Sequence, residues 1–188
     1  MIIKNTSESF GLVSKSLHWI MAIILTGLFT VGLYMTGLEY YDPLYHRLPW
    51  WHKSFGLLTI FLLLLRFVWR QFNPLPSPLN THNKWEISLA HIIQKSFYFL
   101  ILLIGISGYF IATAKGKGIE FFMFFKVPAI TEELAEDRAD LIGNAHELMA
   151  ILLAVLVVLH ALAAIKHHFI DKDETLHRMT KSNKKLNN

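Results

Sequence analysis

Four long apolar segments dominate the pattern of hydrophobic and polar positions along the chain. A helix needs about 20 mostly apolar residues to cross a bilayer, and each segment is close to that length or longer. Polar and turn-forming residues separate the segments and leave only short connections. The pattern predicts an all-α integral membrane four-helix bundle that forms a single domain over residues 1–188. The expected helices cover about 18–38, 52–70, 87–113 and 142–166, followed by a polar tail over 169–188.

Proline and aromatic residues mark the ends of these segments. Residues 73–78 read Asn-Pro-Leu-Pro-Ser-Pro, and proline cannot donate to the helical hydrogen-bond ladder, so the second helix must end there. Trp50 and Trp69 lie near predicted helix ends, where amphipathic rings favour the headgroup level. The longest connection, 115–140, contains the aromatic run 121–125. We expect that run to lie in the membrane interface.

Composition supports a membrane protein. Apolar residues make up 53% of the chain, and the mean hydropathy of +0.39 exceeds that of an ordinary soluble domain. Lys4 and Lys15 before the first apolar segment would also suit a secretory signal. However, the segment is longer than a usual signal core, and cleavage would remove His18. We therefore expect the first segment to be retained as a membrane helix.

The distribution of lysine and arginine predicts the orientation in the membrane. Twelve of the eighteen basic residues lie near the N-terminus, in the 66–95 region or after residue 165, together with only five of the fourteen acids. Both termini are therefore expected to face the cytoplasm. The other side carries six basic and nine acidic residues, with most of the acids in the 119–140 loop.

The chain contains no cysteine. This excludes disulfides, iron–sulfur clusters, thiolate metal sites and covalently attached c-type haem. Any haem must be held by coordination and packing alone. The lipid bilayer is the expected environment, and no nucleic-acid partner is expected.

Ten histidines is a high number for this length. A histidine within hydrocarbon is costly and points to a functional site, although a lone buried histidine is more often simply hydrogen-bonded to a neighbouring helix. The joint arrangement of four histidines favours a functional site over simple hydrogen bonding. His18 and His160 are expected at one level near the cytoplasmic face, and His52 and His146 at the opposite level.

The spacing on the fourth segment suggests what these levels hold. His146 and His160 are fourteen residues apart, which in a helix leaves them about 40° apart in azimuth and about 21 Å apart along the axis. One face of this helix thus presents two ligands, each matched by an imidazole from another helix. This arrangement predicts two non-covalent haem b groups, each with bis-histidine coordination that favours electron transfer over oxygen binding.

Arg66 follows His52 by the same fourteen residues and returns to the same helix face, at the level of the inner histidines. An arginine there suits a haem propionate as bidentate partner. The alternative, that it reaches the headgroups, is equally acceptable for Arg66 and preferable for Arg70. Gly56, one turn beyond His52, could admit a porphyrin or simply allow close helix packing.

Further histidines lie toward the cytoplasmic face. His167 lies on nearly the same helix face as His160 and about 10 Å further along. His167 could therefore border a quinone head group, and His168 and His91 are further candidates for the same pocket. An equal alternative is that His167 and His168 form a pair that faces the lipid headgroups. The remaining three are expected to be solvated in loops or tail: His46, His82 and His177.

Taken together, these residues resemble the bacterial cytochrome b561 family, and the resemblance covers nearly the whole chain. The matching pieces are Ser16-Leu17-His18-Trp19, His52-x3-Gly56, Arg66 before the proline-rich turn, Gly108 with Lys115-Gly116, Ala145-His146-Glu147, and His160-x6-His167-His168 running into Lys172-Asp173-x-Thr175-Leu176-x-Arg178-Met179.

The resemblance implies a four-helix, di-haem protein of the inner membrane that oxidises periplasmic superoxide and reduces ubiquinone. It assigns His52 and His146 to one haem and His18 and His160 to the other, in agreement with the depth argument, and His167 to the quinone pocket. It offers no motif for the outer substrate site. Cationic side chains there would attract an anion despite the acidic loop. They are Lys53, Arg47, Lys115 and Lys117.

Two other functions remain open. The chain could be a relay and anchor subunit that accepts electrons from a periplasmic dehydrogenase or hydrogenase docked on its acidic outer loop. It could instead be a non-redox membrane protein whose histidines bind zinc or only pack. A haem spectrum separates the last alternative from the redox functions, and activity of the purified chain separates the enzyme from the relay.

Overall fold

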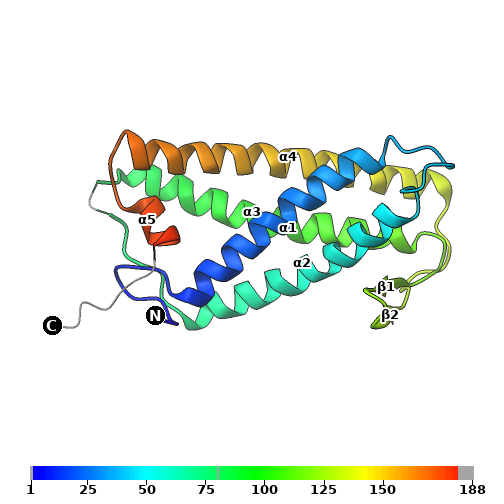
Figure 1. The fold of residues 1–188 in the computed structure, drawn as a ribbon, viewed down its shortest axis with the longest axis horizontal. Helices are drawn as coiled ribbons and strands as arrows, with labels where there is room; N and C mark the ends of the chain where they lie inside the picture. Colours follow the sequence, from blue (N-terminus) through cyan, green and yellow to red (C-terminus); the bar gives the residue numbers. More distant parts are fainter. Residues whose placement is uncertain (1, 80, 182–188) are drawn as a thin grey trace.

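The computed structural model describes residues 2–79 and 81–181 and contains four long helices that form an elongated bundle (Figure 1). All four are long and apolar enough to cross a membrane. They are α1 (Leu12–Met35), α2 (Arg47–Phe72), α3 (Lys84–Thr113) and α4 (Glu136–Phe169). A short hairpin of β1 (Ile119–Phe121) and β2 (Phe125–Val127) precedes α4, and α5 (Thr175–Thr180) follows it. The sequence-based prediction of a four-helix membrane bundle is confirmed.

The helices are longer than the apolar segments that predicted them, mainly at their N-termini. α1 begins at Leu12 rather than near residue 18, and α4 begins at Glu136 rather than near 142. The first turn of α4 contains Glu136 and Asp137, whose charges favour a helix N-terminus. α3 begins with a capping box between Asn83 and Glu86. Hydropathy alone misses these turns because they are polar.

The two ends of the bundle differ. The N-terminus, the 73–83 connection and α5 lie together at one end, here called the terminal end, and the β-hairpin lies at the other, here called the hairpin end (Figure 1). At the terminal end, the Arg178 guanidinium donates to the Ser77 carbonyl (2.7 Å), and the Ser77 amide donates to the Ser7 carbonyl (2.8 Å). The predicted polar tail therefore includes a packed helix, and residues 182–188 lie outside the described range.

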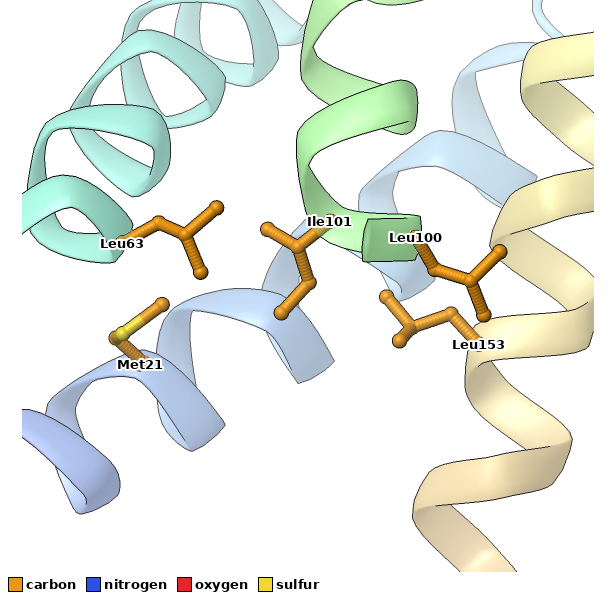
Figure 2. Packing of buried hydrophobic residues seen from close by; sticks show 5 residues of the cluster. All are labelled: Met21, Leu63, Leu100, Ile101 and Leu153. Atoms are coloured by element: carbon orange, nitrogen blue, oxygen red, sulfur yellow. The ribbon is translucent and has the colours of Figure 1, made fainter. Parts of the chain in front are cut away.

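The apolar core contains one buried cluster to which all four long helices contribute (Figure 2). Leu153 of α4 belongs to this cluster and lies seven residues from both His146 and His160. The core thus occupies the level midway between the two histidine levels. The cluster consists of Met21, Leu63, Leu100, Ile101 and Leu153. Most other large apolar side chains are exposed on the bundle surface, as expected for helices surrounded by lipid.

Candidate functional site

Two histidines from different helices face each other toward the hairpin end. The ring centroids of His52 on α2 and His146 on α4 are 6.4 Å apart. His52 is packed against α1, where a Cβ at Gly32 would lie 3.4 Å from its Cε1. Its buried Nδ1 makes no well-aligned hydrogen bond among the described residues, and the Leu28 carbonyl of α1 lies close to the ring.

The hydrogen bonds of His146 fix its tautomer. Its Nδ1 lies 3.0 Å from the Ile104 carbonyl oxygen and 3.1 Å from Ser107 Oγ. A carbonyl oxygen can only accept, so Nδ1 carries the proton and Nε2 keeps a free lone pair. Metal-binding histidines use this arrangement, in which the second ring nitrogen donates to a backbone carbonyl.

A second pair of histidines lies toward the terminal end. The ring centroids of His18 on α1 and His160 on α4 are 6.3 Å apart. Arg66 of α2 joins this pair, because its Nη2 is 3.3 Å from His18 Nδ1. The structure therefore brings together the three residues that the sequence predicted at this level. Arg70, one turn further, lies over the Tyr98 ring, with its Cζ 5.9 Å from the ring centroid.

The spacing within both pairs fits a metal held between two imidazoles. With a metal–nitrogen bond of about 2.0–2.1 Å and a ring radius of about 1.1 Å, two rings on opposite sides of one metal have centroids about 6.3 Å apart. The closeness of helix packing differs around the bundle. Close backbone packing joins α1 to α2, α2 to α3 and α3 to α4, whereas neither α1 nor α2 packs closely on α4 within the described residues. Each histidine pair bridges one of these wider separations.

The glycines near the histidine pairs separate into two types. A Cβ at Gly56 would meet no atom within 4 Å, so this half-buried glycine faces open space beside His52. A Cβ at Gly108 would lie 3.0 Å from His146 Cε1, and one at Gly105 would overlap Ile60. Gly56 therefore fits the wall of a cofactor cavity, whereas Gly105 and Gly108 permit close helix packing.

A depression with a basic lining lies at the hairpin end. It contains three of the four predicted anion-binding residues, but Arg47 is not part of it. Lys126 lines it as well, and the sequence gave no signal for this role because β2 was not predicted. Ser54 is fully buried beside Lys53 and fixes the hairpin, since its Oγ donates to the Glu120 carbonyl (3.2 Å) and accepts from the Phe122 amide (3.3 Å). The charged lining residues are Lys53, Lys115, Lys117, Glu120 and Lys126.

At the terminal end, His167 belongs to a polar cluster. Its Nδ1 lies 2.8 Å from Asp171 Oδ2 and 3.2 Å from Asp173 Oδ2. The sequence-based expectation that His82 is solvated is wrong, because its side chain is only 18% exposed and its Nε2 donates to Asp173 Oδ2 (3.1 Å). The connection before α3 folds against α5 and so buries His82. The sequence alone does not predict this fold.

The two carboxyl groups of this cluster are ionised at neutral pH. The hydrogen bond from Lys166 Nζ holds the pKa of Asp171 below its usual value. Burial opposes ionisation of Asp173, but hydrogen bonds from Thr175 and His82 outweigh it, and the pKa of Asp173 is lowered.

The other two predicted quinone-site histidines lie apart from this cluster. The His168 ring contacts that of His177, with centroids 4.9 Å apart, and the half-buried His177 also pairs with Glu174 at 3.1 Å, so it is not simply solvated. His91 is exposed on α3 and makes no ring contact with His167 or His168 in the described part of the chain. His46 is exposed, as predicted.

Comparison with known proteins shows the family of this chain. Residues 9–182 match the family described as Prokaryotic cytochrome b561. The chain belongs to the prokaryotic cytochrome b561 family. It is 44% identical to Cytochrome b561 homolog 2 of Escherichia coli (strain K12) over 179 residues, which cover 95% of each chain.

More distant members of the cytochrome b561 family also match along most of their length. Probable superoxide oxidase CybB of Yersinia pestis is 26% identical over 92% of this chain and 96% of its own. Cytochrome b561 homolog 1 of Escherichia coli (strain K12) is 29% identical over 87% and 92%. Membership of the cytochrome b561 family makes this chain a multi-pass inner-membrane electron-transfer protein and implies b-type haem.

Proposed function

We propose that this chain is a superoxide:ubiquinone oxidoreductase that holds two b-type haems, one at each histidine pair. The observation that supports this most strongly is the pair of centroid distances, 6.4 Å for His52 and His146 and 6.3 Å for His18 and His160. Held between such rings, haem b supplies one-electron redox chemistry.

The protein residues at each pair have distinct tasks. His146 is oriented by the Ile104 carbonyl, so its Nε2 would be available to hold haem iron. With its Nε2 on iron, His18 would carry a proton on Nδ1 and would not accept from Arg66. The Arg66 guanidinium would then be free to bind a haem propionate, whose carboxylate it matches in geometry and charge.

The basic depression at the hairpin end supports an anionic donor on that side of the membrane. Lys53, Lys115 and Lys117 line it, and Lys53 follows His52 directly in the sequence. A positive local field raises the encounter rate with a small anion such as superoxide. We propose that the hairpin end faces the periplasm and that both termini face the cytoplasm.

The terminal end supports reduction of ubiquinone. Two superoxide anions lose one electron each to give two molecules of dioxygen, and the quinone gains two electrons and two protons to become a quinol. We propose that the quinone head group binds near His167, which lies about 10 Å beyond His160 along α4. Asp171 and Asp173 orient the His167 ring, and protons come from the adjoining aqueous face.

Reversal of charge in the basic depression tests this function. Lys115→Glu with Lys117→Glu should slow reduction of the purified haem-loaded protein by a superoxide flux, and should flatten the dependence of the rate on ionic strength. Lys84→Glu with Lys181→Glu, two exposed positions at the opposite end, makes the same charge change and should leave the rate unchanged. Equal rates in all three proteins would contradict the proposed donor site.

One observation supports the relay function as an alternative. The connection before α4 exposes Glu132 and Glu133, and the first residue of α4 exposes Glu136, at the same end as the hairpin. Such an acidic surface suits a basic redox partner. A relay subunit should be inert toward superoxide when purified alone, whereas dithionite should still reduce it.

A further inference from the structure

A compact group of metal-binding side chains lies at the terminal end, outside both histidine pairs. His82, His167 and Asp173 each present one ligand atom, and these atoms all lie within 4.8 Å of one another. The residues come from three segments that are distant in sequence: the 73–83 connection, the end of α4 and the link to α5. The Asp173 side chain is only 3% exposed, and the two histidine side chains are 18% and 15% exposed.

Two of the distances within the group are close to those between the ligands of a tetrahedral metal ion. Asp173 Oδ2 lies 3.1 Å from His82 Nε2 and 3.2 Å from His167 Nδ1. Ligand atoms about 2.0–2.1 Å from a tetrahedral metal are separated from one another by about 3.3 Å, so both distances match edges of the tetrahedron. Asp171 Oδ2, 2.8 Å from His167 Nδ1, provides a further oxygen on the same side.

A purely structural network explains only part of this arrangement. Asp173 Oδ1 accepts from the Thr175 amide (2.8 Å) and so already caps α5. The second oxygen, Oδ2, is therefore left to face two imidazoles whose centroids are 4.8 Å apart. His167 Nδ1 is buried and, within the described residues, has no aligned hydrogen bond despite its close carboxylates. A metal ion would give this nitrogen an aligned bond in place of its ion pairs with Asp171 and Asp173.

We propose that His82, His167 and Asp173 bind a divalent transition-metal cation of the zinc class, with Asp171 or a water molecule as the fourth ligand. Imidazole and carboxylate are ligands that zinc accepts in such sites. The ion would fasten the 73–83 connection to α4 and α5. The inference concerns binding alone and does not depend on the proposed oxidoreductase activity.

Zinc chloride titrated into the detergent-purified, haem-loaded full chain tests the proposal. Isothermal calorimetry should give one saturable site per chain, and zinc-edge X-ray absorption should give a nitrogen and oxygen shell with outer-shell scattering from two imidazoles. His82→Gln and Asp173→Asn keep hydrogen-bonding capacity at both positions but remove a ligand. Each should weaken zinc binding by at least about tenfold.

His177→Gln is the matched control, because His177 lies on α5 outside the group and pairs with Glu174. It should bind zinc as the unsubstituted chain does, and an unchanged haem spectrum checks the fold of every variant. No saturable site, or undiminished binding in His82→Gln and Asp173→Asn, would overturn the proposal and leave only adventitious surface binding. If a variant fails to fold, the unsubstituted chain still tests the proposal. A zinc-edge absorption spectrum that shows no scattering from imidazole would overturn the proposal.

Discussion

At the scale of single residues, the environment of His146 shows how the bundle prepares a ligand. The Ile104 carbonyl and Ser107 hold its Nδ1, and Gly108 of the same helix leaves space beside its Cε1. Position and tautomer are both set by α3, the helix that packs closely on α4. Such support fixes ligand geometry before a metal binds.

Substitution of Gly108 tests this support. In Gly108→Ala, the new Cβ would lie 3.0 Å from His146 Cε1, so the ring must shift. We expect weaker haem retention at the hairpin-end pair and unchanged retention at the other, measured by haem content after detergent washing. Gly27→Ala, where a Cβ meets nothing within 4 Å, is the matched control and should keep both haems. Equal retention in the two variants would contradict this role of Gly108.

Fourteen-residue spacings on one helix face predicted His146 with His160 and His52 with Arg66. His18 was predicted from its depth in the membrane. The sequence could not predict that His82 approaches His167, since their contact depends on how an irregular connection folds over α5. Lys126 was missed for the same reason, because the three-residue strand that carries it gives almost no pattern.

At the scale of elements, the β-hairpin is attached to the bundle largely through α2. Ser54 joins the Glu120 carbonyl and the Phe122 amide, and Phe55 packs edge-on against Phe122 with ring centroids 5.1 Å apart. Phe122 and Met123 have positive φ values of 44° and 65°, a costly conformation for non-glycine residues that the surrounding contacts must maintain.

Loss of the Ser54 hydroxyl should therefore loosen the hairpin. Ser54→Ala leaves the Phe122 amide without its acceptor, at a cost of about 1–3 kcal/mol for a buried group. Amide hydrogen exchange across residues 119–127 should become faster, while haem content stays unchanged. Thr26→Ala removes a hydroxyl that bonds only to its own helix, at the Ala22 carbonyl, and should leave the hairpin protected. Slow exchange in both variants would show that Ser54 does not hold the hairpin.

At the scale of the whole molecule, the four helices place the start of α1 and the short helix α5 at one end of the bundle and the hairpin at the other (Figure 1). The absence of cysteine makes this arrangement simple to test in the membrane. In intact spheroplasts, an impermeant thiol reagent should label Met123→Cys, whose parent side chain is 84% exposed, but not Ser7→Cys. Permeabilised cells should label both. Labelling of Ser7→Cys in intact spheroplasts would reverse the proposed orientation.

The central claim is that two histidine pairs each hold one haem b. The most direct measurement is the haem-to-protein ratio of the purified chain by the pyridine haemochrome method, with His146→Ala, His160→Ala and the exposed-loop control His46→Ala. We predict about two haems per chain in the unsubstituted and control proteins, and about one in each of the other variants. One haem in the unsubstituted chain, or two retained in His146→Ala, would contradict the account.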